Sequence, residues 1–178
     1  LSGATTINTT NCENTMVGVG MGLMEQGVPA TYLVKQLDFL LLGIDQLTNT
    51  YNVLRGKPIK APFNIVTIVS DAGYGGAQSA LNTLYDFCSI SRVPGYTITN
   101  KREADMVMHR YFKKPGPAIF ALSERLFGEK IDETIEVVDT HRDEAIIRYS
   151  NGEDATIVCC NFTYPQGVLL QEELRSKG

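Results

Sequence analysis

The sequence has no tryptophan, only two histidines and only four cysteines among its 178 residues. The cysteines show no CxxC spacing, so together with two histidines they argue against a zinc site, and we expect no metal ligands in this chain. So few cysteines favour a reducing compartment, which predicts a cytoplasmic protein. The cysteines are Cys12, Cys88, Cys159 and Cys160.

An excess of positive charge and a long apolar run are also absent. The 16 Lys and Arg are outnumbered by 20 Asp and Glu, giving a net charge of −4, which argues against a nucleic-acid surface. The longest apolar run, residues 39–42, falls far short of the roughly 20 residues that cross a bilayer, so we expect no membrane partner. The first residues lack the features of a signal peptide and an initiator Met, and we expect the chain to be part of a longer one.

What is present is an ordinary globular composition, with 43% hydrophobic and 20% charged residues, in which strand and helix patterns alternate. This alternation predicts an α/β fold for residues 1–130: an open, mostly parallel sheet with helices on both faces. The expected strands are 29–34, 63–69, 96–99 and 117–122. The expected helices are 13–24, 39–54, 79–87 and 101–112.

Beyond residue 130 the pattern changes. Residues 131–152 are charged and contain two short β-like runs, 136–138 and 145–149, so we expect a linker with a small hairpin. Residues 155–160 are typical of a strand and 166–177 of a helix. One strand and one helix cannot form a domain alone, so we expect 153–178 to be the start of a second α/β unit.

Two glycine-rich stretches are candidate ligand sites. The run 18–22 has the wrong spacing for a dinucleotide fingerprint and no preceding strand, so it argues against a nicotinamide site; its glycines indicate that another backbone packs close to the helix. The loop 71–78 follows the carboxyl end of a buried strand, where ligands bind in open parallel sheets. The alternative for this loop is a flexible turn. The two histidines, His109 and His141, are both expected on the surface.

Four segments, in order, resemble the thiamine-diphosphate-dependent enzymes of the transketolase group, which includes transketolase, deoxyxylulose-phosphate synthase and the beta subunit of the 2-oxoacid dehydrogenase decarboxylating component. The first is Ile7-Asn-Thr-Thr-Asn-Cys-Glu-Asn-Thr-Met-Val-Gly-Val-Gly-Met-Gly22, which is similar to the segment that carries the catalytic glutamate. The others are 37–46, with its Ile-Asp-Gln pattern, 115–127, similar to the closing strand, and 154–158, similar to the beginning of the family's C-terminal domain. The resemblance covers nearly the whole chain and implies a pyrimidine-binding domain.

The resemblance makes Glu13 the candidate catalytic residue. It implies that this carboxyl group hydrogen-bonds a ring nitrogen of the aminopyrimidine and favours the imino tautomer, which takes a proton from the thiazolium carbon. Burial against apolar neighbours such as Met16 raises a carboxyl pKa in the direction this role requires. Without the resemblance, Glu13 is a first-turn carboxylate favoured by the helix dipole.

The resemblance also implies cofactor contacts from Phe39, whose ring would pack on the aminopyrimidine, and from Leu37, where relatives often carry another aromatic. Met16 completes the expected apolar wall. The alternative for Phe39 is a helix core position. In the loop 71–78 the family commonly has a His near the Gln, and here there is none. Tyr74 and Gln78 are the candidate substrate-loop residues, and the missing His puts the reaction type in doubt.

The family holds the diphosphate and Mg²⁺ with a Gly-Asp-Gly motif on another domain, and this chain has no such motif. The resemblance therefore implies thiamine diphosphate and Mg²⁺ as cofactors, a partner domain or subunit that completes the site, a keto or sugar substrate, and a hetero- or homo-oligomer. Three interpretations stay open: a subunit of an enzyme for ketol transfer or 2-oxo acid decarboxylation, a non-catalytic relative that partners a complete enzyme, or a flavodoxin-like binding module.

Overall fold

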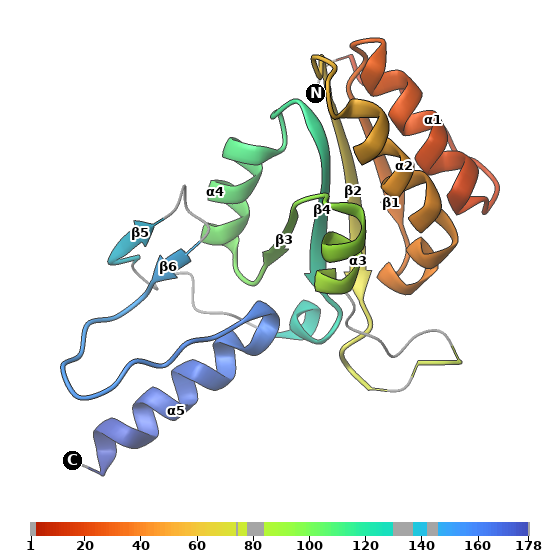
Figure 1. Ribbon diagram of the computed structural model, residues 1–178. Coiled ribbons are helices and arrows are strands. Elements are labelled where there is room, and N and C mark those ends of the chain that lie inside the picture. Colours follow the sequence, from red (N-terminus) through yellow and green to blue (C-terminus); the bar gives the residue numbers. More distant parts are fainter. Residues whose placement is uncertain (1–2, 74, 78–83, 130–136, 142–145, 178) are drawn as a thin grey trace.

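The computed structural model describes residues 3–73, 75–77, 84–129, 137–141 and 146–177. Its main unit is built on four parallel strands in the spatial order β1-β2-β4-β3 (Figure 1). In the register of the sheet, Ile65 at its centre pairs with Tyr32 on one side and Ile119 on the other. The strands are β1 (Ala30–Val34), β2 (Pro62–Val69), β3 (Gly95–Ile98) and β4 (Gly116–Ser123).

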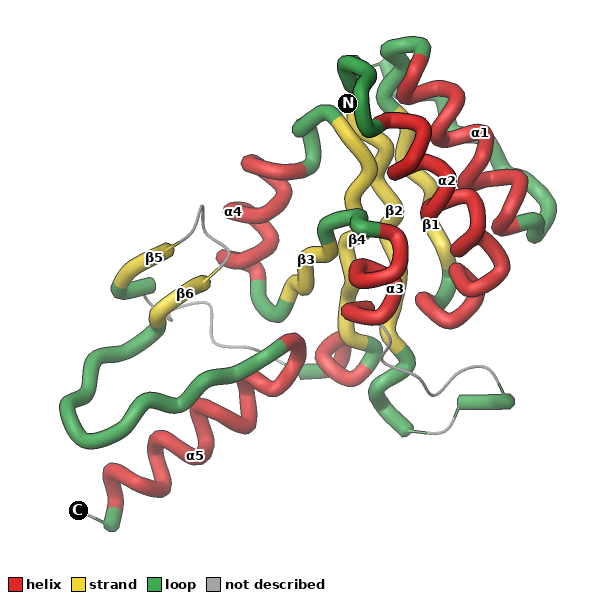
Figure 2. The backbone as a smooth tube through the Cα atoms, in the orientation of Figure 1, coloured by secondary structure: helices red, strands yellow, loops and turns green. Residues whose placement is uncertain are grey.

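Helices cover both faces of the sheet, as the sequence predicts, but unequally (Figures 1 and 2). One face carries α1 (Glu13–Glu25), the 3₁₀ helix η1 (Leu37–Gly43), α2 (Ile44–Leu54) and α3 (Leu84–Ser91), and the other carries α4 (Lys101–Tyr111). The handedness of the connections explains this. Crossovers between parallel strands are right-handed, so connections that advance along the sheet lie on one face, and the return from β3 to β4 lies on the other.

Two apolar clusters lie on the two faces, because successive residues of a strand point to opposite sides. Ile119 and Ala121 of β4 join the larger cluster beneath α1, η1, α2 and α3. The alternate residues of the same strand, Ala118 and Phe120, join a smaller cluster with Val107 of α4. The strand β4 is therefore buried from both sides, which explains its nearly continuous apolar sequence.

The glycines of α1 serve different purposes. A Cβ atom on Gly20 would lie 2.1 Å from Cε2 of Phe63, so only glycine lets the Phe63 ring fit beneath the helix. The close neighbour at Gly20 is thus a side chain, whereas the sequence analysis expected a backbone. A Cβ atom on Gly22 would meet nothing within 4 Å, and one on Gly18 would touch only the side chain of Gln46.

The helix expected over 39–54 is divided in two, which corrects the prediction. Its first part is η1, in which Leu37, Leu40 and Gly43 are buried at intervals of three, while Leu41 and Leu42 are about half exposed. A spacing of three matches the three residues per turn of a 3₁₀ helix, so burial of this face favours the tighter form. The α-helical part, α2, begins only at Ile44. The expected helix 79–87 begins outside the described residues, and its described part, α3, ends four residues later than predicted.

After the short turn η2 (Arg125–Gly128), two antiparallel strands, β5 (Asp139–His141) and β6 (Ile146–Arg148), pair in the predicted linker. The second lies within the predicted run 145–149, whereas the first follows the predicted run 136–138 and does not overlap it. The strand predicted at 155–160 is wrong, because the chain there is irregular. A strand needs a neighbour for its backbone groups, and no described strand pairs with this segment, whose Val158 is 78% exposed. A turn, η3 (Asn161–Thr163), leads into the predicted helix, α5 (Tyr164–Ser176).

Buried polar contacts attach this later segment to the main unit. The carboxylate of Glu103, which is 8% exposed, accepts hydrogen bonds from the backbone N–H of Thr99 at 2.8 Å and from the hydroxyl of Tyr149. The Arg125 guanidinium donates to the carbonyl oxygen of Phe162 at 3.0 Å. Burial, and then the contact with Glu103, strongly raise the pKa of Tyr149, so its hydroxyl stays a donor at neutral pH.

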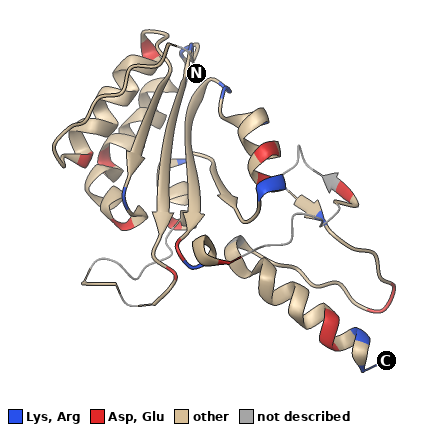
Figure 3. Ribbon diagram, turned by 180° about the vertical axis from the view of Figure 1, so that it is seen from behind, with Lys and Arg blue, Asp and Glu red and all other residues tan. Residues whose placement is uncertain are grey.

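Two surface properties complete the description. Seen from behind, Lys and Arg are interspersed with Asp and Glu along the elements (Figure 3). Within the described residues, no helix combines the length and the apolar character that crossing a membrane requires.

Candidate functional site

The carboxyl ends of the four parallel strands meet at one edge of the sheet, which we call the carboxyl edge. The turn η1 follows β1 there, the glycine-rich loop follows β2, and η2 follows β4 (Figure 1). Side chains from segments far apart in sequence can therefore meet at this edge, which is where ligands bind in open parallel sheets.

Glu13 begins α1, and the first turn of this helix lies against the end of η1. A Cβ atom on Gly43 would approach the carbonyl oxygen of Glu13 to 3.3 Å and Cγ2 of Val17 to 2.8 Å, so the two elements are in close contact. This contact brings Glu13 to the carboxyl edge. Its side chain is half-buried, and among the described residues no hydrogen bond is made to its carboxylate.

Tyr32 lies close to Glu13 and was not among the residues singled out from the sequence. Burial raises the pKa of Tyr32, and the charges of Glu13 and Cys12 raise it further. The phenol is therefore protonated at neutral pH and is a hydrogen-bond donor beside the carboxylate. The sequence feature that could have identified Tyr32 is the alternation of more buried and more exposed residues along β1. This alternation turns Ala30, Tyr32 and Val34 toward the helices.

The predicted apolar contacts differ in exposure. Phe39 in η1 and Met16 in α1 are both partly buried, and Phe39 packs against the main core. Leu37 is fully buried within that core, beneath η1. The first two side chains thus keep surface that a ligand could touch, while Leu37 supports the turn from below. Roles of all three in cofactor binding stay predictions.

A polar network joins the ends of three strands at the carboxyl edge. The Gln36 amide, after β1, donates to Ser70 Oγ, after β2, at 2.9 Å. The Asp71 carboxylate accepts from Ser123 Oγ, at the end of β4, at 2.6 Å and from the backbone N–H of Arg125 at 3.1 Å. These contacts hold the base of the loop after β2. Sequence reasoning missed this network, although each member directly follows or ends an apolar run.

The loop after β2 is described only in part. Tyr74 and Gln78, the predicted substrate-loop residues, lie outside the described residues. Gly73 and Gly76 have φ values of 126° and 147°, a region that favours glycine, so the loop uses a backbone path that few other residues adopt. His109 lies exposed on α4, as expected. Over the described part of the chain, no group of three His, Cys, Asp or Glu side chains is arranged to hold a metal ion.

Comparison with known proteins gives one distant similarity and no matching family model. The chain is 24% identical over 156 residues to the protein named 2-oxoisovalerate dehydrogenase subunit beta 2, mitochondrial, of Arabidopsis thaliana. The alignment covers 82% of this chain and 40% of the relative, so the chain spans less than half of the relative's length. This similarity gives loose support to the transketolase-like family that the four sequence segments resemble.

Proposed function

We propose that this chain is the pyrimidine-binding half of a thiamine-diphosphate-dependent enzyme of the transketolase type, which makes or breaks a carbon–carbon bond next to a carbonyl. The observation that carries the proposal is the placement of Glu13. Half-buried Glu13 lies at the carboxyl edge, where its backbone carbonyl contacts the end of the turn that contains Phe39, and no described residue forms a hydrogen bond to its carboxylate. The segment around Glu13 is also one of the four that, in order, resemble the family.

The residues present fit an aminopyrimidine ring. Such a ring needs a carboxyl group for one nitrogen and apolar surface for its face, and Glu13, Phe39 and Met16 are of these kinds. The turn η1 packs against the first turns of α1, which keeps the carboxylate and the phenyl-bearing turn in fixed relation. When bound, thiamine diphosphate would supply an electron sink for the carbon whose bond is broken.

Within this proposal Glu13 shares a proton with the ligand through its Oε atoms. The carboxylate is partly shielded by the helix–turn contact, and a hydrogen bond is stronger where water is partly excluded. Tyr32 lies close enough for the Glu13 charge to raise its pKa, so its phenol stays protonated and adds a hydrogen-bond donor to this edge. Phe39 and Met16 hold the ring face and exclude water from that side.

The substrate and the partner follow from the family resemblance. It implies that a second domain or subunit binds Mg²⁺ and the diphosphate in a hetero- or homo-oligomer, and within the described residues no three His, Cys, Asp or Glu side chains are grouped to hold a metal ion. The name of the Arabidopsis relative favours a 2-oxo acid as the substrate, and ketol transfer between sugars is the alternative. The lack of a His in residues 71–78 favours a reaction in which another group, from the partner, handles the substrate proton.

Native mass spectrometry of the protein from its own source tests this proposal. We expect a heteromeric or self-associated complex that releases thiamine diphosphate, with the diphosphate-binding chain identified by its mass. A complex that releases flavin, or a lone chain without thiamine diphosphate, would refute the proposal. Activity that is unchanged by Glu13→Gln in a complex that does hold the cofactor would favour the non-catalytic alternative, which the missing loop His also supports.

A further inference from the structure

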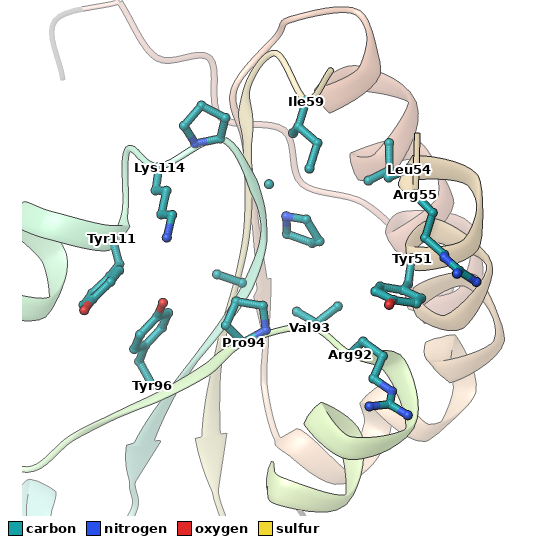
Figure 4. Close-up of a pocket in the computed structure, with 14 residues that line it drawn as sticks. Tyr51, Leu54, Arg55, Ile59, Arg92, Val93, Pro94, Tyr96, Tyr111 and Lys114 are labelled. Atoms are coloured by element: carbon teal, nitrogen blue, oxygen red, sulfur yellow. The ribbon is translucent and has the colours of Figure 1, made fainter. Parts of the chain in front are cut away.

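A groove of about 270 Å³ opens at the amino ends of the strands, on the edge opposite Glu13 (Figure 4). We call this side the amino edge. The groove is formed where β3 and β4 begin, where α2 and α4 end, and where the chain turns after α3. No function assigned above uses it.

The groove has an apolar floor and aromatic walls. Pro94 lies in its middle and Tyr51 stands on one side of it (Figure 4), and Pro117 and Ala118 also line it. On the other side the rings of Tyr96 and Tyr111 stack at a centroid distance of 4.3 Å. Flat apolar walls of this kind accept a flat ring or a short apolar chain, and a volume of this size suits a small molecule.

Positive charge lies at both ends of the groove. Arg55 and Arg92 lie at the end beside Tyr51, and Lys114 lies at the end beside Tyr96 (Figure 4). None of the described residues that line the groove is acidic, and none of these three cations forms an ion pair with a described residue. Arg55 and Lys114 lie over the rings of Tyr51 and Tyr111, at 6.0 Å and 5.9 Å from the ring centroids, so two of the cations face the aromatic walls.

Arg92 has an unusual backbone. Its φ of 59° makes it the only non-glycine residue with a left-handed conformation in the described part of the chain. Glycine, or Asn, takes this conformation with less strain, so packing of the turn alone would favour one of those residues. The turn is held by Ser91, whose hydroxyl donates to the carbonyl oxygen of Phe87 and accepts from the backbone N–H of Val93. The left-handed residue ends α3, as is common one residue after a helix, and this turn places Arg92 in the lining of the groove.

We propose that the amino-edge groove binds a small organic anion, one that joins a flat apolar body to a phosphate or carboxylate group. The apolar floor and the tyrosine walls contact the body, and the cations at the ends contact the charged group. Inorganic phosphate alone would gain nothing from the floor, and an uncharged ring would gain nothing from the cations. The groove lies at the far end of the strands from Glu13, so it is a second site, independent of the proposed cofactor.

Calorimetric titration of the intact protein with phenyl phosphate tests the proposal, with inorganic phosphate and phenol as matched partial probes. We expect saturable binding of phenyl phosphate with a Kd on the order of 1 mM or tighter. Each partial probe should bind at least about tenfold more weakly. Equal binding of inorganic phosphate, or no saturable binding of phenyl phosphate, would overturn the proposal. Binding of an acidic peptide in place of phenyl phosphate would overturn it too, because the groove would then be a protein interface.

Variants locate the binding in the groove. Arg92→Gly removes a cation and relieves the left-handed backbone, so the variant should fold. Combined with Lys114→Gln, it should weaken phenyl phosphate binding by about tenfold or more. Lys113→Gln is the control, because it removes an exposed neighbouring charge that does not line the groove, and it should change Kd by less than about twofold. Equal Kd values for the double variant and the control would overturn the assignment.

Discussion

The two edges of the sheet are chemically unlike. At the carboxyl edge, Glu13, Asp71 and several hydroxyl groups lie with Tyr32 and Arg125, whereas the described lining of the amino-edge groove combines arginine, lysine and tyrosine with no acidic residue. Helix direction explains part of the contrast, since α2, α3 and α4 all end at the amino edge, and basic residues after a helix complement its negative C-terminal dipole. The dipole explains neither the aromatic walls nor the left-handed Arg92. On the two proposals above, one sheet holds an acid–base group at one edge and binds an anion at the other.

The strongest test of the contrast is Glu13→Gln in the assembled complex. A glutamine keeps the shape of the side chain but cannot share a proton, so we expect turnover to fall by about 10²–10⁴-fold. Steady-state kinetics measures this, and phenyl phosphate binding at the other edge should be unchanged. Glu172→Gln, an exposed change on α5, is the matched control and should keep wild-type turnover. Turnover within a few-fold of wild type in Glu13→Gln would remove Glu13 from the proposed chemistry.

The next largest effect concerns how α1 holds Glu13 at its edge. Gly20→Ala would place a methyl group 2.1 Å from an atom of the buried Phe63 ring, and we expect a loss of about 1–3 kcal/mol in the free energy of unfolding. Gly22→Ala is the control on the same helix, because its methyl group meets nothing within 4 Å. That change should stabilise by up to about 1 kcal/mol through helix propensity. Urea denaturation compares them, and equal stabilities would contradict the described packing.

A smaller effect is expected at the ring wall of the carboxyl edge. Phe39→Ala should weaken thiamine diphosphate binding by about tenfold, since the apolar face for the ring is lost. Calorimetry on the assembled complex measures the Kd. Leu41→Ala in the same turn is the control, because Leu41 is 50% exposed, and it should leave the Kd unchanged. If both variants bind the cofactor like wild type, Phe39 is a core residue, as the alternative from the sequence holds.

The last comparison needs no substitution and concerns one thiol at each edge. Burial raises the pKa of Cys88 to about 11, and its Sγ lies against Gly95 at the start of β3. At pH 8 only about one thousandth of Cys88 is thiolate, so alkylation should be slower there than at the exposed Cys12 beside Glu13. Because the folded state favours the neutral thiol, its contribution to stability is present below pH 9 and lost as the pH rises toward 11. Mass spectrometry of iodoacetamide-treated protein measures the alkylation rates of Cys88 and Cys12, and equal rates would contradict the predicted difference.

Much of the main unit was predictable from the sequence because its signals are local. The buried run at β2 and the alternation of elements predicted the parallel sheet, and the strand bounds differ from prediction by about one residue. The helix expected over 39–54 was partly wrong, because spacings of three and four both fit a short apolar run and only packing against α1 decides between them. The strand expected at 155–160 was wrong because strand formation depends on a neighbour that a local pattern does not supply.

The candidate site was predictable only through the family resemblance. Glu13 and Phe39 were named from it, while composition and periodicity alone left Glu13 as an ordinary helix-start carboxylate. Tyr32 and the network around Asp71 depend on strands brought together by the fold, so no single segment reveals them. The amino-edge groove is even harder to predict from a local pattern, because its cations come from three connections between Arg55 and Lys114 in the sequence. The domain bounds, the partner and the cytoplasmic location remain predictions.

The notch that Gly20 leaves in α1 has a consequence for how mutational data on this protein would look. The Phe63 ring in that notch prevents the helix from sliding or turning on the sheet. Glu13 lies seven residues earlier on the same helix, about 10 Å along its axis, and moves with it as one rigid body. In a screen scored by activity alone, position 20 would therefore rank beside position 13. Only a separate measure of folding would distinguish Gly20, where the helix fits the Phe63 ring, from Glu13, which we propose shares a proton with the cofactor.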